Sequence, residues 1–403
     1  MERRFASVLP PRAERPRRAW LTDTFDDLNG VARTIRTLAS LAAKTDRPIT
    51  VVTCRTDLPA TDFPLRHFAP VGTFVLPEYP QQTLTAPPVL DMLAWLEAAA
   101  LEELIISTPG PVGLVGRLAG PLLGLRMRGV YHTDFPNYLR QWTEDDLMGD
   151  LAWRFMRWFY GPMERVYVPS QAYLEQLAEA GFERERLRVL PRGVDISIFR
   201  PDRRDEAFWK GWGRHGGLKF LYVGRIAEEK NLRALIEAWK RLYERPGEAT
   251  LILVGDGPAR EALQRSCARP DVVFTGALYG ETLAIAYASA DIFVFPSLTD
   301  TFGNVVLEAH ASGLPAIVAD RGGPPEIVRS HGSGLVTTGD PAALAEAMRR
   351  LRDDPALRDR LRTRALERAR ASRWEAVLQL LDEASDTVTA ATPRRAPEPA
   401  AVG

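Results

Sequence analysis

Short apolar runs alternate with longer amphipathic stretches along most of the chain. Runs of this length, each followed by a turn signal and a helical segment, are typical of a parallel sheet wrapped by helices. The expected strands are residues 18–22, 49–53, 104–107, 127–132 and 165–169 in the first half, and 219–223, 250–254, 272–275, 292–296 and 316–319 in the second. The pattern therefore predicts an α/β protein with two doubly wound, Rossmann-like domains that face a ligand-binding cleft.

The same pattern divides the chain into segments. Residues 1–17, rich in Arg and Pro and without an apolar stretch, predict a disordered basic arm. Residues 18–195 and 196–372 are the two expected domains, and the turn-rich and charged region 190–214 connects them. We expect a helix at 373–386 that crosses back to the first domain, followed by a disordered tail at 387–403.

Composition narrows the classes of function. The 403 residues are 45% apolar and 26% charged, which excludes disorder for the bulk of the chain. Fifty-two basic residues balance fifty-two acidic ones, so no global field attracts nucleic acid, and we expect none as a partner. Cys54 and Cys267 lack neighbours at metal-ligand spacing, and no run is apolar enough for a secretory signal or a membrane span. We therefore expect a cytoplasmic protein that binds through local sites.

A first candidate site follows the strand expected at 219–223. Gly224 and Arg225 come directly after this strand, and Lys230 lies just before a helix. Free backbone N–H groups and the helix dipole favour an anion at such a junction, so two added cations suit a diphosphate. The alternative is a solvated helix start with Glu229 as a local partner. Only five cations of this chain are lysines, so a lysine at this position favours the phosphate interpretation.

A second candidate site follows the strand expected at 292–296. Asp300 precedes a turn at Gly303, where a backbone can approach a ligand closely, and Glu308 lies in the helix that follows. These acids could meet sugar and ribose hydroxyls. The alternative makes Asp300 a helix cap and Glu308 a helix-face acid.

These segments resemble a known family. Gly224-Arg225, Glu229-Lys230, Gly255-Asp256-Gly257-Pro258, Pro296-Ser297, Asp300 to Gly303, Glu308-Ala309, Ser312 to Pro315 and Gly322 to Glu326 are similar, in this order, to the donor domain of retaining family 4 glycosyltransferases with the GT-B fold. In the first half, residues 22–31, Pro169-Ser170 and residues 192–195 also match. Tyr131 to Tyr138 resembles the His-Thr-Asp-Phe signature of members that make glycolipids, such as diacylglycerol glycosyltransferases and lipid α-mannosyltransferases.

The resemblance implies roles for particular residues. Arg225 and Lys230 would stabilise the leaving diphosphate as a divalent metal does in other glycosyltransferases, and Asp300 would hold the hexose hydroxyls. His132 would contact the sugar near the reacting carbon, and Glu308 would hold the ribose. The remaining donor-binding positions are Gly30, in the first loop, Gly224, Thr301, Phe302, Gly303 and Asn304.

The implied activity is a hexosyltransferase that moves a hexose from a UDP- or GDP-sugar to a lipid or lipid-linked acceptor, with retention at the anomeric carbon. No metal and no cofactor beyond the nucleotide sugar is expected. Acid pairs such as Asp26-Asp27 and the run Glu144 to Asp146 offer a less favoured metal site. A soluble sugar or polysaccharide acceptor, or a protein that binds nucleotide sugar without catalysis, remains an alternative.

Two positions depart from the family pattern, and one segment bears on the acceptor. Asp300 stands where Glu is usual, and His310 stands where an apolar residue is usual. The aromatic and basic segment 147–166 could touch the inner face of a membrane as a peripheral contact, but burial beneath the cleft is the favoured interpretation.

Overall fold

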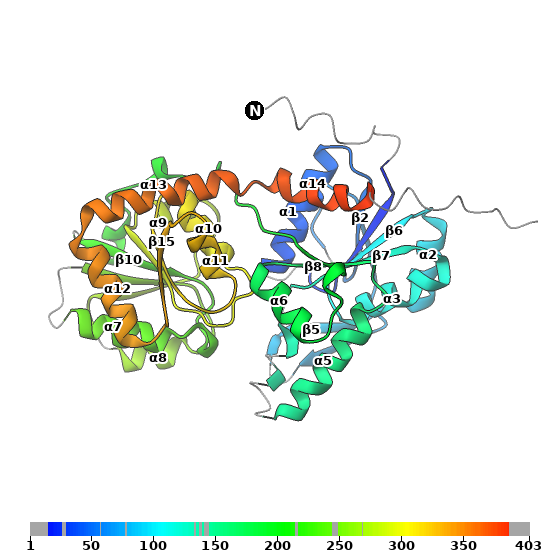
Figure 1. Cartoon of the computed structure of the whole chain (residues 1–403), viewed down its shortest axis with the longest axis horizontal. Coiled ribbons are helices and arrows are strands. Elements are labelled where there is room, and N and C mark those ends of the chain that lie inside the picture. The colour runs from blue at the N-terminus through cyan, green and yellow to red at the C-terminus, as the bar shows by residue number, and fades with distance from the viewer. Residues whose placement is uncertain are drawn as a thin grey trace, which may run out of the picture.

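The chain folds into two α/β units, shown in Figure 1 for the computed structural model. The structure describes residues 15–25, 30–56, 58–76, 79–132, 134–136, 139–140, 145–213, 217–243, 249–267 and 269–386. The predicted arm and tail lie mostly or wholly outside these residues. Within the arm, Arg15 Nη1 donates to the backbone oxygen of Thr45 at 3.2 Å.

The first unit is built on a seven-stranded parallel sheet with the order β3-β2-β1-β6-β7-β8-β9. Its strands are β1 (Arg18–Leu21), β2 (Ile49–Cys54), β3 (Leu65–Phe68), β6 (Glu103–Ile106), β7 (Arg126–Val130), β8 (Arg165–Val168) and β9 (Leu187–Val189). An antiparallel hairpin, β4 (Gly72–Leu76) and β5 (Tyr79–Ala86), lies between β3 and the next helix. The helices are α1 (Gly30–Lys44), α2 (Val89–Ala98), α3 (Pro111–Leu123), α5 (Asp146–Tyr160) and α6 (Gln171–Glu179).

The second unit is built on a six-stranded parallel sheet with the order β12-β11-β10-β13-β14-β15. Its strands are β10 (Leu218–Val223), β11 (Ala249–Val254), β12 (Val272–Gly276), β13 (Ile292–Phe295), β14 (Ala316–Ala319) and β15 (Gly334–Thr337). The helices are α7 (Leu232–Leu242), α8 (Arg260–Ser266), α9 (Gly280–Ala288), α10 (Asn304–Ala311), α11 (Pro324–Arg329), α12 (Pro341–Asp353) and α13 (Pro355–Ala371). The two-domain α/β prediction is confirmed.

All ten predicted strands are present, whereas β3, β9, β15 and the β4–β5 hairpin were not predicted. Nine of the predicted strands are interior strands, which have both faces covered and read as apolar runs, and the tenth, β12, is an edge strand that begins with three apolar residues. The three missed sheet strands are edge strands of three or four residues, and β3 is largely exposed. An edge strand with polar residues carries no apolar pattern to recognise.

The connecting region contributes to the second core. Phe199 and Trp209, which lie in the segment predicted as a linker, are buried with the side chains of β10 and α9. The indole N–H of Trp209 donates to the backbone oxygen of Ser289 at 2.9 Å. The segment therefore wraps over the second sheet, with short 3-10 turns at Pro201–Arg203 and Phe208–Trp212.

The chain crosses between the domains twice, and the two crossings lie side by side. The backbone N–H of Val194 donates to the backbone oxygen of Ser372 at 2.9 Å. A Cβ on Gly193 would lie 2.6 Å from the indole ring of Trp374, so only glycine permits this approach. Helix α14 (Trp374–Asp386) then packs against α1 of the first domain, as Figure 1 shows.

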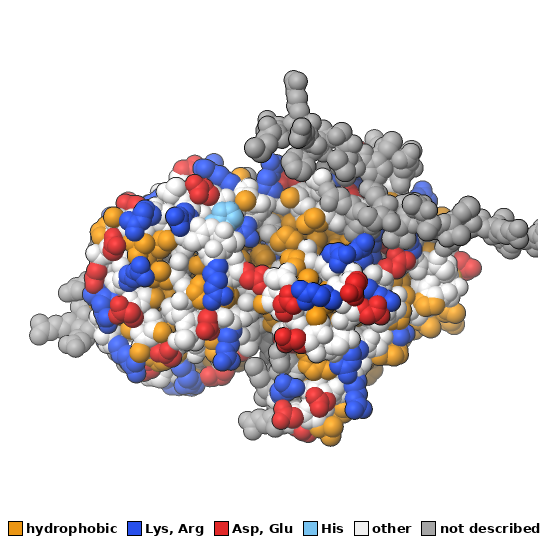
Figure 2. Space-filling model, in the orientation of Figure 1, with side chains coloured by type: hydrophobic (Ala, Val, Ile, Leu, Met, Phe, Trp, Pro, Cys, Tyr) orange, Lys and Arg blue, Asp and Glu red, His pale blue; other side chains and the backbone are white. Residues whose placement is uncertain are grey.

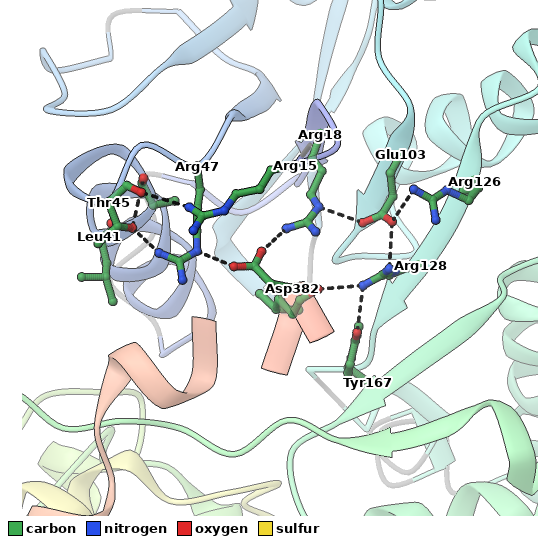
Figure 3. A network of polar contacts seen from close by, with 12 residues as sticks. Arg15, Arg18, Leu41, Thr45, Arg47, Glu103, Arg126, Arg128, Tyr167 and Asp382 are labelled. Carbon is green, nitrogen blue, oxygen red and sulfur yellow. Dashed lines mark hydrogen bonds and ion pairs between the residues drawn. The ribbon is translucent and has the colours of Figure 1, made fainter. Parts of the chain in front are cut away.

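A buried ionic network holds α14 on the first sheet (Figure 3). Asp382 contacts Arg18 Nη1 at 2.7 Å and Arg47 Nε at 2.5 Å. Glu103 contacts Arg18 Nε at 3.2 Å and Arg128 Nη2 at 2.9 Å. Because these groups are almost fully removed from water, each charge depends on its partners. On the face shown in Figure 2, by contrast, charges of both signs are interspersed.

Candidate active site

The loop after β10 contains backbone conformations and close backbone contacts that need glycine at Gly224, Gly255 and Gly257. Gly224 has φ of 154°, and a Cβ on Gly255 would lie 1.9 Å from the Gly224 backbone oxygen. A Cβ on Gly257 would lie 2.4 Å from the Ile226 backbone oxygen. The Gly255-Asp256-Gly257 motif thus packs directly beneath the loop that carries Arg225, and it supports this loop sterically.

The two predicted cations lie at this loop, and each has an acidic partner. Lys230 Nζ donates to Asp300 Oδ2 at 2.7 Å, which joins the ends of the neighbouring strands β10 and β13. Arg225 forms an ion pair with Glu229, as the solvated-helix alternative expects. Asn231, with φ of 57°, donates from Nδ2 to the backbone oxygen of Gly339 at 2.9 Å and so fixes the turn after Lys230. Each cation is therefore positioned by a carboxylate.

Two helix N-termini from different domains meet beside these cations. Helix α10 begins at Asn304 after Gly303, which has φ of 91°, and α1 begins at Gly30. A Cβ on Gly30 would lie 3.1 Å from Asn304 Nδ2, so the two helix starts are in close approach. Asn304 Oδ1 is buried without a hydrogen-bond partner among the described residues. Phe302 is buried beneath this turn. The positive end of the α10 dipole favours an anion here.

Glu308 lies buried in α10 and faces the first domain. It forms an ion pair with Arg33 of α1, and Tyr287 donates its hydroxyl to Glu308 Oε2 at 3.0 Å. Burial raises the pKa of Glu308, whereas the positive charge of Arg33 and the hydroxyl of Tyr287 act in the opposite direction. Arg33 was not predicted as a site residue, because an arginine in the first turn of an amphipathic helix has the same pattern as a solvated one.

His132 lies two residues after the end of β7, in a chain of buried polar groups. Its Nδ1 lies 2.8 Å from Arg192 Nη2, and its Nε2 lies 3.2 Å from Ser107 Oγ. Trp20 Nε1 also donates to Ser107 Oγ. Burial, followed by the positive charge of Arg192, lowers the pKa of His132 well below its usual value. Sequence reasoning missed Ser107, which stands in no recognised motif. It gave Arg192 no role, although residues 192–195 match the family pattern.

Two further contacts tie the domains together. Thr301 Oγ1 donates to the backbone oxygen of His132 at 3.0 Å. Glu326, at the start of α11, accepts hydrogen bonds from the backbone N–H groups of Gln171 and Ala172 and so caps α6 of the other domain. The structure therefore brings the predicted residues of the two halves to one junction, and Glu326 gains a contact that its motif alone did not predict.

Other predicted features separate into structural and undescribed ones. Asp134 of the Tyr131–Tyr138 signature is buried, and it accepts hydrogen bonds from Tyr131, Tyr173 and Gln176. Thr133, Asn137 and Tyr138 of this signature lie outside the described residues, as do Asp26, Asp27 and Glu144 of the alternative metal site. Among the described residues, no three His, Cys, Asp or Glu side chains gather as a metal site would.

The aromatic helix α5 is mainly part of the first core. Met156, Phe159 and Tyr160 are buried, and Trp153 and Phe155 pack against the same cluster, which agrees with the favoured interpretation. Trp158 departs from it with 51% of its surface exposed. The guanidinium of Arg117 on α3 stacks 3.7 Å from the centre of the Trp158 ring.

Two parallel-sheet domains joined at their strand ends, with a lysine–aspartate pair in the loops that precede α7 and α10, have the arrangement of a GT-B protein. The model of Glycosyltransferase Family 4 matches residues 28–198, and the model of Glycosyl transferases group 1 matches residues 217–354. The two matches cover one domain each and support a family 4 type glycosyltransferase with the GT-B fold. The expectation of an enzyme of the hexosyltransferase class agrees with them.

Individual relatives agree with this assignment. A GDP-mannose-dependent α-mannosyltransferase of Mycobacterium tuberculosis is 36% identical over 249 residues, which span 62% of this chain and 63% of the relative. Sulfoquinovosyl transferase SQD2 of Arabidopsis thaliana is 34% identical over 278 residues, which span 67% of this chain and 53% of the relative. The matches thus span less than two thirds of either relative.

A solved structure shares the whole fold. HepE of Anabaena in complex with UDP superimposes with a TM-score of 0.73 at 18% identity, and the superposition covers 92% of this chain and 100% of that structure. In the part of the chain that the structure describes, no helix combines the length and the apolar character needed to cross a membrane.

Proposed function

We propose that the protein is a retaining hexosyltransferase that uses a nucleotide diphosphate sugar without a metal ion and glycosylates a lipid or lipid-linked acceptor. The observation that carries the proposal is the Lys230–Asp300 pair in the loop before the N-terminus of α10, which the start of α1 approaches at Gly30. The pair places a positive charge next to backbone N–H groups, where a diphosphate would lie, and places a carboxylate next to it, where the attached sugar would begin.

The charges of this site suit the bond that breaks. As the bond between the anomeric carbon and the diphosphate oxygen breaks, negative charge grows on the nucleoside diphosphate. The acceptor oxygen forms the new bond to that carbon, and its proton passes to the departing diphosphate. An ammonium has three N–H donors, and the contact to Asp300 uses one, so Lys230 can hold Asp300 and phosphate oxygens together. Arg225 would add a second charge. Cations fixed beforehand stabilise a leaving group without reorganisation.

The other predicted residues complete the donor site in this proposal. Glu308 would accept hydrogen bonds from the ribose hydroxyls, sharing its carboxylate with Arg33 and Tyr287. His132 and Asp300 would contact the hexose from opposite domains. Gly30, Gly224 and Gly303 would allow the backbone to approach the phosphates and the sugar.

A group of exposed leucines supports the lipid acceptor. Leu114, Leu118 and Leu122 recur at every fourth position of α3, and Leu147 and Leu151 do so on α5. Arg117 joins the two helices, because its guanidinium donates to the backbone oxygen of Trp158 at 3.0 Å. Exposed leucines on these two helices, with Arg117 between Leu114 and Leu118, would suit the interface of an anionic membrane at the cytoplasmic face.

The proposal is tested by transfer assays with UDP- and GDP-hexoses and a mixture of lipid acceptors. We expect turnover in EDTA and a 10²- to 10³-fold lower rate for Lys230→Ala with the fold intact. Lys210→Ala, which removes an exposed lysine, is the matched control. Near-normal turnover of Lys230→Ala contradicts the assigned role, and a strict manganese requirement contradicts the metal-free mechanism.

The same assays separate the alternatives. A protein that binds nucleotide sugars without catalysis gives a thermal shift with a donor but no product with any acceptor. Transfer to soluble sugars and not to lipids favours the soluble acceptor. Flotation with anionic vesicles tests the membrane contact, because Leu118→Ser with Leu122→Ser should abolish flotation while leaving the donor-induced thermal shift unchanged.

A further inference from the structure

We propose that Arg192 is a positioning residue that holds the His132 ring in a single neutral tautomer, with its proton on Nε2. Three observations place Arg192 next to this ring: the contact of 2.8 Å between Nη2 and His132 Nδ1, the burial of both side chains, and the fixed course of the backbone beside Arg192. The part of the inference that concerns sugar binding rests on the proposed function, whereas the tautomer itself does not.

The tautomer follows from the chemistry of the two partners. A guanidinium has donors only, so His132 Nδ1 must act as the acceptor and carry no proton. A neutral imidazole then has its proton on Nε2, which lies 3.2 Å from Ser107 Oγ. Ser107 Oγ also accepts from Trp20 Nε1. A protonated ring would place a second positive charge against Arg192 in a site removed from water.

No negative charge near the ring, among the described residues, offsets the repulsion between Arg192 and a protonated His132. Among the described residues, no carboxylate pairs with Arg192, and its Nη1 is buried without a hydrogen-bond partner. Arg192 is the charged group that acts on His132, and together with burial it lowers the pKa of the ring. Burial also lowers the pKa of Arg192 itself, to about 10, so the guanidinium stays charged at neutral pH.

The fold fixes Arg192 at this position. It follows β9 and directly precedes Gly193, which lies against Trp374 at the double crossing between the domains. The backbone of His132 is held from the second domain, because Thr301, in the loop between β13 and α10, donates a hydrogen bond to the carbonyl oxygen of His132. The ring is therefore fixed in orientation and in protonation, and it acts as a hydrogen-bond donor through Nε2–H rather than as a proton carrier.

The direct test is the nitrogen NMR spectrum of the full chain labelled with ¹⁵N-histidine. The chain has five histidines, so the spectrum is sparse, and His132→Gln identifies the resonance. We expect the shifts of an Nε2–H tautomer that do not change between pH 5.5 and 9. If the wild-type protein shows an Nδ1–H tautomer, or if the ring titrates within this range, the proposal is overturned.

Arg192→Met adds the causal test. Without the guanidinium, we expect His132 to populate both tautomers or to titrate nearer to 6.5, the ordinary histidine pKa. An unchanged His132 spectrum in a folded Arg192→Met protein contradicts the assignment. Arg360→Met, which removes the charge of an exposed residue on α13, should leave the His132 signals unchanged.

Activity provides a separate measurement. With a donor that the wild type turns over, Arg192→Met should lower the rate roughly 10- to 100-fold, since the donor N–H is no longer fixed. It should also add an acid limb to the pH profile that the wild type and Arg360→Met lack; a profile without this limb contradicts the positioning role. If no donor is turned over, the proposed function fails while the NMR result still decides the tautomer.

Discussion

His310 lies in the interior of the second domain and provides a sharp test of the packing behind the site. Its side chain is fully buried in α10, two residues after Glu308, and neither ring nitrogen has a hydrogen-bond partner among the described residues. Burial lowers the pKa of His310 to about 3, with further lowering by Arg368 and His331. The substitution His310→Met replaces the ring with an apolar side chain of similar size.

The expected effect follows from these contacts. A buried polar group without a partner costs about 1–3 kcal/mol, so His310→Met should raise the free energy of unfolding by about 2 kcal/mol at pH 8. For a domain of this size, this corresponds to a rise of about 4–8 °C in Tm.

The pH dependence gives a second magnitude. Because the folded-state pKa of His310 lies below its unfolded value, the unfolded chain binds a proton that the folded chain does not bind between about pH 6.5 and pH 3. Stability contributed by neutral His310 is therefore fully present above pH 6.5 and is lost as the pH falls, by up to about 1.4 kcal/mol per pH unit. The advantage of His310→Met should widen accordingly from pH 6.5 to pH 5.5.

The assay is denaturant unfolding of the nucleotide-free protein at pH 8, 6.5 and 5.5. His67→Met, on the exposed strand β3, is the control and should behave as the wild type at each pH. A His310→Met protein that is no more stable than the wild type at pH 8 refutes the argument from unpartnered nitrogens. A constant difference between pH 8 and pH 5.5 refutes the titration argument.

Three further substitutions test other parts of the structure. Asp382→Asn leaves Arg18 and Arg47 without their shared carboxylate and should destabilise the protein by about 3 kcal/mol in denaturant unfolding. The control Asp353→Asn, at an exposed residue, should not change the stability. Equal stability of both variants would show that the network in Figure 3 does not anchor α14. Gly255→Ala places a Cβ against the Gly224 oxygen and should cost more than about 2 kcal/mol and weaken UDP- or GDP-sugar binding by calorimetry; Gly211→Ala, which meets nothing within 4 Å, is its control. Glu326→Ala removes the cap of α6 and should increase the radius of gyration of the nucleotide-free protein, as measured by small-angle scattering. The control Glu346→Ala, at an exposed residue, should not change this radius. An unchanged radius in Glu326→Ala would show that this contact does not hold the domains together.

The sequence was sufficient to locate the interior strands of both sheets and the loops that carry the candidate site residues. Strands buried on both faces appear as apolar runs, so β10 and β13 and the loops that follow them could be located without coordinates. Lys230 and Asp300 were recognised because each stands at a strand end within an ordered set of motifs. The roles assigned to them stay predictions that the proposed assays address.

The sequence could not show which side chains meet across the domains. Arg33 and Glu308 are 275 residues apart, and Arg192 and His132 are 60 apart, so no local pattern links them. Asp382 follows the second domain but is buried in the first. Such pairs depend on where the double crossing at Gly193 and Trp374 directs the chain.

Local periodicity and turn residues therefore predicted the positions of the interior strands and of the glycine-containing loops, including the loop with Lys230. These features depend on residues that lie close together in the chain. Only the tertiary structure decided that Lys230 is held by Asp300, that Glu308 is shared with Arg33, and that His132 is fixed by Arg192. These contacts arise from long-range packing, which brings distant side chains within hydrogen-bonding distance and removes them from water.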